Sequence, residues 1–125
     1  MRDGPGLAEG LEKIVELRTR VESCGTGGSK SLAFNPGWHT ARDLESMLDN
    51  AEALLRSAAE RKESRGAHAR SDFPKTEDEF GAVNFIVEKT AAGMTVKAER
   101  RPPLPDYLAE AVHHSYARYT PEETE

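Results

Sequence analysis

The sequence predicts a mainly α-helical fold, an antiparallel helical bundle followed by a β-hairpin and a short terminal helix. Two stretches repeat apolar residues every three or four positions, which is the period of one face of an α-helix. A later stretch alternates apolar and polar residues between positions 83 and 99, which is the period of a strand. A proline-rich segment separates this hairpin from the last helical stretch.

Length and composition limit what this fold can hold and bind. The chain has 125 residues, of which 37% are hydrophobic and 31% charged, so only a thin core is available. The formal net charge of −5 opposes a general attraction to phosphates, and we expect no nucleic-acid partner. A single cysteine, Cys24, cannot form an intrachain disulfide, which favours a reducing, cytoplasmic setting.

The first helix is predicted over residues 7 to 23. Its apolar residues recur at spacings of three and four, which places them on one stripe with charged residues outside it. These apolar residues are Leu7, Leu11, Ile14, Leu17 and Val21. The Gly-rich run at residues 25 to 29 should end the helix, because it is a flexible linker without apolar groups to anchor it. This run lacks the Gly-Lys-Ser/Thr continuation of a P-loop, so we expect no phosphate site there.

A second, longer helix is predicted from about residue 40 to 64. The pair Asn35-Pro36 is a helix-start signal, and Thr40 is a second candidate N-cap. At the other end, cations gather where the helix dipole is negative, and Gly66 is the expected left-handed C-cap. The helix should therefore stop just before this glycine.

The part of the chain after residue 80 changes character. Two alternating stretches surround a loop that contains Gly93, and together they predict a β-hairpin. The proline-rich run at residues 101 to 105 must be extended, because proline lacks a donor and biases the preceding residue away from helix. Beyond it, Asp106 is a candidate cap of a short final helix, and the chain end is expected to fray.

A dense set of charged residues follows the second helix. Residues 61 to 74 read RKESRGAHARSDFP, which combines arginines, carboxylates and a turn-forming glycine. Two interpretations are open, solvated charges at a helix C-terminus or a site that binds an anion or fastens two protein surfaces together. In the second case an arginine such as Arg65 could form a bidentate pair with a carboxylate, which a lysine could not reproduce.

This stretch resembles the signature Arg-x-Glu-Ser-Arg-Gly-x-His-x-Arg-x-Asp-x-Pro of the C-terminal helical domain of succinate dehydrogenase and fumarate reductase flavoprotein subunits. Residues 35 to 59 resemble the long helix that leads into that signature. The resemblance covers about residues 2 to 80. We therefore expect a flavoprotein C-terminal helical domain at residues 1 to 80, and a hairpin, proline-rich spacer and final helix at residues 81 to 125. The resemblance implies a spectrin-repeat-like bundle whose first helix is missing from this chain.

The resemblance also implies a function for a parent protein. In this family succinate and fumarate are interconverted by hydride exchange with FAD, and electrons pass to an iron–sulfur subunit. The parent complex would lie at the cytoplasmic face of the inner membrane, held there through partner subunits. The charged turn would contact the flavin-binding and capping domains of the same subunit. The interdomain contact residues expected on this basis are Arg61, Glu63, Ser64, Arg65, Gly66, His68 and Arg70.

No residue of this chain is expected to be catalytic, or to bind a cofactor or a metal. The family's substrate-holding and proton-shuttling residues lie in the flavin-binding and capping domains. No Gly-x-Gly-x-x-Gly fingerprint occurs here, so FAD is expected in the parent and not in this chain, which alone should be inactive. The neighbours His113 and His114 would point about 100° apart on a helix and could not both bind one ion.

Two alternatives and one oligomeric state stay open. The C-terminal domain of L-aspartate oxidase carries a related signature, and a free-standing helical interaction module would also need no cofactor motif. Two amphipathic helices without a third leave part of their apolar stripes uncovered. An isolated chain could therefore form a homodimer that completes a four-helix bundle. The residues expected near its seam are Leu11, Ile14, Leu48 and Leu55.

Overall fold

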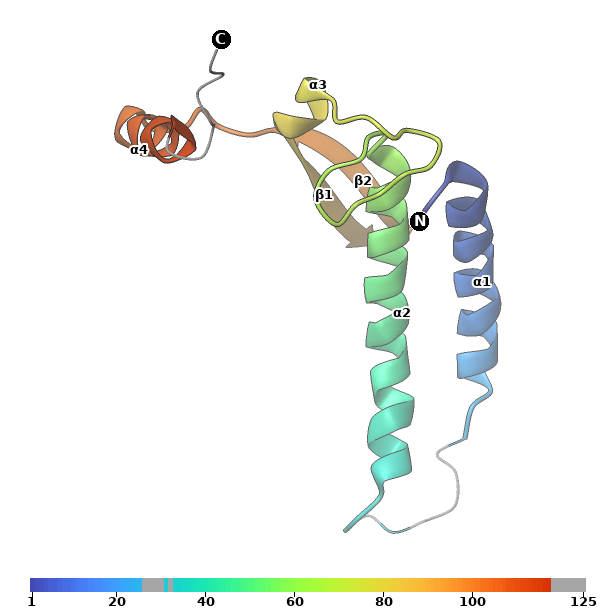
Figure 1. Cartoon of the computed structure of the whole chain (residues 1–125). Helices are drawn as coiled ribbons and strands as arrows, with labels where there is room; N and C mark the ends of the chain where they lie inside the picture. Colours follow the sequence, from blue (N-terminus) through green and yellow to red (C-terminus); the bar gives the residue numbers. More distant parts are fainter. Residues whose placement is uncertain (26–30, 32, 118–125) are drawn as a thin grey trace.

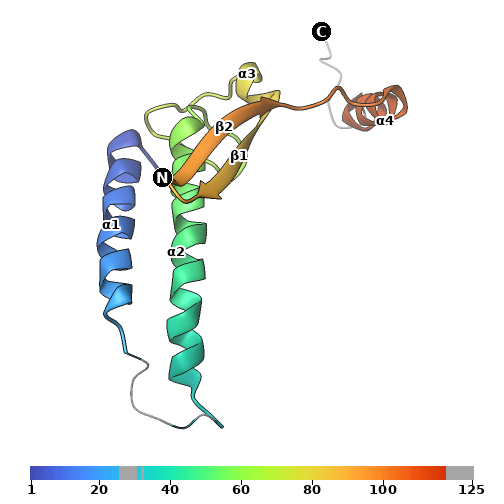
Figure 2. The same ribbon diagram turned by 180° about the vertical axis from the view of Figure 1, so that it is seen from behind.

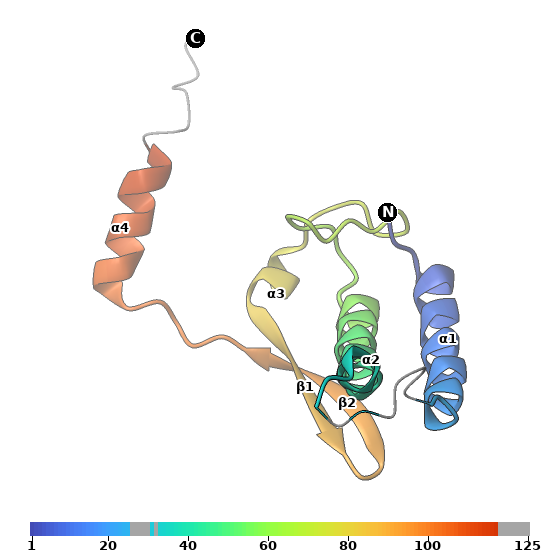
Figure 3. The same ribbon diagram turned by 90° about the horizontal axis from the view of Figure 1, so that it is seen from below.

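The computed structural model of the chain describes residues 1–25, 31 and 33–117. It confirms the mainly helical fold with a hairpin and a short helix (Figure 1). The elements are α1 (Gly4–Glu22), α2 (Pro36–Glu60), α3 (Asp78–Gly81), β1 (Val83–Thr90), β2 (Gly93–Arg100) and α4 (Asp106–Ala117). Helices α1 and α2 lie side by side, and the hairpin lies against the C-terminal half of α2 (Figure 2). Seen along α2, this helix stands between α1 and the hairpin (Figure 3).

Helix α1 starts earlier than predicted because Asp3 caps it. The Asp3 carboxylate accepts a hydrogen bond of 2.8 Å from the backbone N–H of Gly6, which satisfies a donor that the helix itself cannot. A proline in the first turn also fits helical geometry there. Leu7 and Ile14, on the predicted stripe, are buried.

Helix α2 starts at the first of the two candidate signals. The Asn35 side chain accepts a hydrogen bond of 3.1 Å from the backbone N–H of Trp38, with proline at the first helical position. Thr40, the second candidate N-cap, is instead inside the helix, where its hydroxyl donates to the Pro36 carbonyl at 3.1 Å. The predicted start near residue 40 is therefore wrong, because Asn35 already caps the helix at the earlier signal.

The end of α2 also differs from the prediction. The helix stops at Glu60, and Arg61 already has an extended backbone with φ −79° and ψ 94°. Gly66 does adopt a left-handed conformation, with φ +55°, but in a separate turn between Arg65 and His68. Its predicted role as the helix C-cap is therefore wrong. The reason lies in the tertiary structure, because Glu63, two positions after Arg61, is buried in the interior. Its contacts are described below.

The two long helices approach closely and share an ion-pair network. A Cβ added at Gly10 of α1 would lie 3.1 Å from a Leu55 methyl of α2, so glycine allows the close approach there. Arg18 of α1 donates to Asp49 at 2.6 Å and to Glu52 at 2.9 Å on α2. Asp49 also accepts from Lys89 of β1 at 2.5 Å, so one carboxylate connects α1, α2 and the hairpin.

The hairpin has the predicted strands and turn. The strands are antiparallel, with Val83 opposite Arg100 and Thr90 opposite Gly93, and Gly93 has φ +120°, which only glycine adopts easily. Met94 is buried where the hairpin packs on α2. A short helix, α3, for which the sequence analysis predicts no element, precedes the hairpin.

Core packing changes one expectation about a homodimer. Ile14 and Leu48 are buried within one chain, so their expected place at a seam between two chains is wrong. The hairpin covers one side of α2, which the helix periodicity alone could not reveal. Large apolar side chains that stay exposed on the long helices include Val15, Met47 and Leu54.

Helix α4 stands away from the rest of the described chain (Figure 1). The Pro105 carbonyl accepts the first backbone bonds of this helix, from Leu108 at 2.9 Å and Ala109 at 3.0 Å, so Asp106 is its first residue and not its cap. Tyr107 and Val112 are exposed on it. No helix in the described part of the chain has both the length and the apolar character needed to cross a membrane.

Candidate functional site

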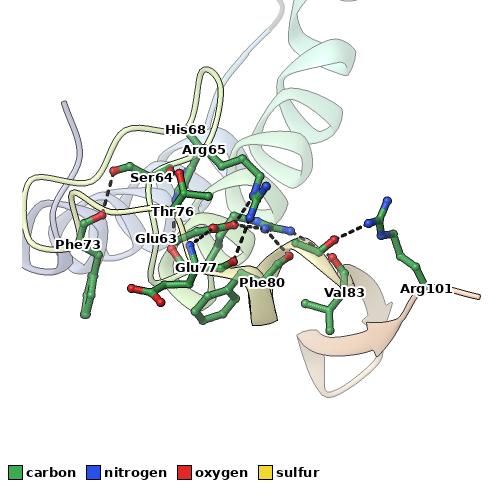
Figure 4. Close-up of polar contacts among 12 residues, drawn as sticks. Glu63, Ser64, Arg65, His68, Phe73, Thr76, Glu77, Phe80, Val83 and Arg101 are labelled. Carbon is green, nitrogen blue, oxygen red and sulfur yellow. Dashed lines mark hydrogen bonds and ion pairs between the residues drawn. The ribbon is translucent and has the colours of Figure 1, made fainter. Parts of the chain in front are cut away.

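The charged residues after α2 fold around one buried carboxylate. Glu63 has 0% of its surface exposed. Its Oε1 accepts from Arg61 Nη1 at 2.5 Å and from Arg65 Nε at 3.0 Å, and its Oε2 accepts from the backbone N–H of Glu77 at 2.9 Å. Figure 4 shows the Glu63 carboxylate between the Arg65 and Glu77 contacts. Both carboxylate oxygens are therefore satisfied, as a buried charge requires.

The surroundings of Glu63 keep it ionised. Burial alone would raise the pKa of its carboxyl group, because it disfavours the charged form. Hydrogen bonds from Arg65, the Glu77 backbone and Arg61 outweigh this and lower the pKa to about 2. The group is thus a fixed negative charge at neutral pH, unsuited to exchange a proton there.

Arg61 and Arg65 connect this carboxylate to the start of the hairpin. Arg61 donates to the carbonyls of Phe80 at 2.9 Å and Val83 at 3.3 Å, and its guanidinium lies 4.8 Å from the centre of the Phe85 ring. Arg65 Nη2 donates to the Glu77 carbonyl at 2.9 Å. The carboxylate that Arg65 meets is therefore in its own chain, and the contact runs through a single nitrogen. These bonds hold the segment that leads into the hairpin close to the end of α2.

Ser64 holds the loop that follows. Its backbone N–H donates to the Lys75 carbonyl at 2.9 Å, and its hydroxyl lies 2.9 Å from both the Phe73 carbonyl and the Arg70 backbone nitrogen. Thr76 donates to the Ser64 carbonyl at 2.7 Å. Figure 4 shows Ser64 between Phe73 and Thr76, with the loop folded back on itself. A single small hydroxyl thus satisfies backbone groups from both arms of the loop.

Arg70 and Asp72 join this loop to the ends of both long helices. Arg70 is 3% exposed and pairs with Asp72 through Nε and Nη2, both at 2.7 Å. Its Nη1 donates at 2.7 Å to the Ala58 carbonyl in the last turn of α2, a role usual for cations at helix C-termini. Asp72 accepts from the Gly4 backbone N–H of α1 at 2.8 Å. The Arg70 guanidinium and these bonds hold the pKa of the Asp72 carboxyl well below its usual range.

The remaining predicted residues lie on the outside of the loop. Gly66 is exposed at the tip of the turn, and His68 is half-buried, with Nε2 donating to the Arg61 carbonyl at 3.1 Å. Lys62, in the same charged stretch, is exposed and takes no part in the bonds around Glu63. The structure therefore divides the predicted contact residues into a buried group with Glu63 and Arg70, and an outer face with Arg65, Gly66 and His68.

A hollow of about 610 Å³ opens beside this loop, between α2, β1 and the N-terminal residues. Its lining includes Arg2, Leu54, Arg61, His68, Phe85 and Ile86. Arg2 reaches it because residues at the N-terminus pair with the loop, through Arg2 N–H to the Ala69 carbonyl at 3.0 Å and Ser71 N–H to the Arg2 carbonyl at 2.8 Å. Sequence reasoning missed Arg2, since nothing in the sequence indicates that it pairs with residues so far along the chain.

The loop has the properties of a rigid structural element. Every buried side-chain nitrogen and oxygen among the described residues has a hydrogen-bond partner. In the same residues, no group of three His, Cys, Asp or Glu side chains is placed to hold a metal ion. What the arrangement can do is present a fixed outer surface, with the hollow beside it.

Comparison with known proteins gives a match over the entire chain. The model of the family described as "Fumarate reductase flavoprotein C-term" matches residues 1–125, which extends beyond the range of about 2 to 80 expected from the signature. The chain is 38% identical over 92 residues to the fumarate reductase flavoprotein subunit of Mycobacterium tuberculosis, covering 74% of this chain and 16% of that protein. It is 44% identical over 90 residues to the succinate dehydrogenase flavoprotein subunit of Rickettsia bellii, covering 72% and 15%.

Solved structures resemble the fold over a similar range. A chain of Mycobacterium smegmatis Sdh1 in complex with UQ1 superposes with a TM-score of 0.79 at 29% identity, covering 98% of this chain and 21% of that chain. A chain of the structure described as E. coli quinol fumarate reductase with the FrdA E245Q mutation superposes with a TM-score of 0.69 at 27% identity, covering 83% of this chain and 18% of that chain. The present chain thus spans about one sixth of its curated relatives and about one fifth of these solved chains.

Proposed function

This chain belongs to the family of C-terminal domains of succinate dehydrogenase and fumarate reductase flavoprotein subunits, and we propose that it packs against the flavin-binding and capping domains of such a subunit. The observation that supports the proposal most strongly is the hydrogen-bonded loop around Glu63. Its buried charges are satisfied within the chain, while Arg65 and Gly66 on its outer face stay exposed. A rigid surface loses little conformational entropy when it docks.

Within this proposal the predicted contact residues have two roles. Glu63, Ser64 and Arg70 give the loop its shape, because their polar atoms bond inside the chain. Arg65, Gly66 and His68, with the exposed edge of Arg61, would touch the neighbouring domains. A substitution in the first group would disturb docking through the fold, whereas one in the second would disturb it directly.

The proposed parent reaction is the interconversion of succinate and fumarate. Support comes from the names of the relatives, which are fumarate reductase and succinate dehydrogenase flavoprotein subunits. The parent would carry FAD, pass electrons to an iron–sulfur subunit and lie at the cytoplasmic face of the inner membrane through partner subunits. The 125 residues alone would neither retain FAD nor oxidise succinate.

A replacement experiment tests the proposal. The matching segment of the M. tuberculosis fumarate reductase flavoprotein subunit would be deleted, or replaced by this chain. We expect the deletion to lose FAD during purification and the chimera to retain it, with dye reduction that depends on succinate. A chimera that loses FAD although this chain stays folded within it would refute the proposal and favour a free-standing helical interaction module.

A further inference from the structure

The hollow beside the loop combines an uncompensated cation with exposed apolar side chains. Arg2 lies at one edge, while Leu54 of α2 and Ile86 of β1 form part of the wall. Leu54 is 55% exposed and Ile86 43% exposed, although both face a concave surface. None of the side chains that line the hollow is acidic.

The positive charge of Arg2 is not balanced within the described part of the chain. Its guanidinium has one long hydrogen bond there, 3.4 Å to the Ala67 carbonyl, and no ion pair is formed with a described carboxylate. Arg61, the other arginine in the lining, is already paired with Glu63 and stacked on Phe85. The charge available to a ligand in the hollow is therefore that of Arg2.

A second polar group in the lining is also available. The Asn84 side chain is exposed on β1, and among the described residues its amide forms no hydrogen bond. An amide of this kind both donates and accepts, so it can pair with a peptide backbone or a carboxylate. The hollow thus offers a cation, an amide and an apolar wall.

We propose that this hollow binds a peptide segment in which a carboxylate stands next to an apolar side chain, contributed by the flavin-binding part of the longer subunit. The carboxylate pairs with Arg2, and the apolar side chain covers Leu54 and Ile86. The inference rests on the proposed function, because it takes its partner from the parent subunit. Charge complementarity with Arg2 indicates that the bound segment carries a carboxylate. The relatives are much longer than this chain, which spans 15–16% of their length, so a longer subunit of this kind contains other segments that could occupy the hollow.

A small free anion fits the hollow less well than a peptide. It would meet Arg2 alone and leave the apolar wall in water. A peptide with both groups buries the wall and pairs the charge at once, and burial of the wall excludes water from the ion pair.

Photo-crosslinking in the chimera described above tests this inference. A benzophenone amino acid would replace Ile86, and another chimera would carry it in place of Val15, which is exposed on α1 outside the hollow. We expect position 86 to crosslink to a peptide of the flavin-binding part that contains Asp or Glu within a few residues of the attachment point. Position 15 should not crosslink to that peptide.

Charge variants then test the role of Arg2. Arg2→Gln should lower the crosslink yield at position 86 roughly fivefold, whereas Arg2→Lys keeps most of it, since an ion pair of modest exposure contributes on the order of 1 kcal/mol. Arg20→Gln, an exposed arginine on α1 without a described ion pair, is the matched control and should change nothing.

Each outcome bears on one of the two proposals. A chimera that retains FAD but gives no crosslink at position 86, or one to a peptide without a carboxylate, overturns the occupant proposed here and leaves the domain-packing function standing. A yield that Arg2→Gln leaves unchanged also overturns it. A chimera that loses FAD overturns the domain-packing function, and this inference with it.

Discussion

Arg70 and Asp72 form a two-point ion pair, with Nε to Oδ1 and Nη2 to Oδ2 both at 2.7 Å, at the place where the ends of the two long helices meet. Arg70 also bonds the last turn of α2, and Asp72 also bonds the first turn of α1. The pair therefore links the end of α2 to the start of α1 through two side chains of the loop.

The first prediction concerns this pair. Arg70→Lys keeps the charge but loses the planar fork, so it cannot bond Asp72 at two points and Ala58 at the same time. We expect the free energy of unfolding of the chain to fall by about 1–3 kcal/mol, since a buried donor network is left incomplete. Urea unfolding followed by circular dichroism would measure this. Arg20→Lys on the exposed side of α1 is the control, and equal losses in both variants would contradict the prediction.

The second prediction concerns Glu63. Glu63→Gln keeps the shape but removes the charge that two arginines share, leaving Arg61 without its carboxylate partner. Removing one member of a buried pair typically costs about 3–5 kcal/mol, and we expect a loss near the lower end, because Arg65 is partly exposed. Glu60→Gln changes an exposed residue at the end of α2, so its free energy of unfolding should lie within about 0.5 kcal/mol of that of the unsubstituted chain. If the two variants unfold at the same urea concentration, Glu63 does not stabilise the loop.

The third prediction is a pH dependence. The pKa of Glu63 is lowered in the fold from 4.5 to about 2, so the folded chain binds this proton less readily than the unfolded chain does. Its stabilising contribution is fully present above pH 4.5 and is lost as the pH falls from there toward 2. Asp72, whose pKa is also lowered, acts in the same direction. Melting temperatures between pH 7 and pH 2 should fall less steeply for Glu63→Gln below pH 4.5, and parallel curves would rule this out.

The fourth prediction concerns the isolated chain. Met47 and Leu54 stay exposed on α2, at 61% and 55%, and stand seven positions apart on one side of the helix. Without the rest of a subunit to cover them, we expect the chain to associate as a homodimer at micromolar concentration. Sedimentation should show the dimer, and Leu54→Glu should weaken it strongly. Val15→Glu on α1 is the control. If the unsubstituted chain sediments only as a monomer, this association is excluded.

Much of the fold could be predicted from the sequence because its signals are local. The apolar stripe with Leu7 and Ile14 gave α1, and the alternation around Gly93 gave the hairpin and its turn, since both depend on neighbours a few positions apart. The stretch at residues 61 to 74 also indicated the family, which the match over residues 1–125 confirms. Where two local signals competed, as at Asn35 and Thr40, periodicity alone could not decide between them.

Only the tertiary structure decided how the charged stretch is used. Glu63 bonds the backbone of Glu77, 14 positions away, and Asp72 bonds the backbone of Gly4, 68 positions away. Backbone N–H groups are the same at every residue, so no side-chain pattern marks these partners. Helix α2 ends at Glu60, just before the buried Glu63, and Gly66 forms another turn. The pairing of Arg2 with the loop places Arg2 in the lining of the hollow. The sequence determined the local elements and the family, while long-range contacts to the backbone determined where the helix ends and which surface is left to bind a partner.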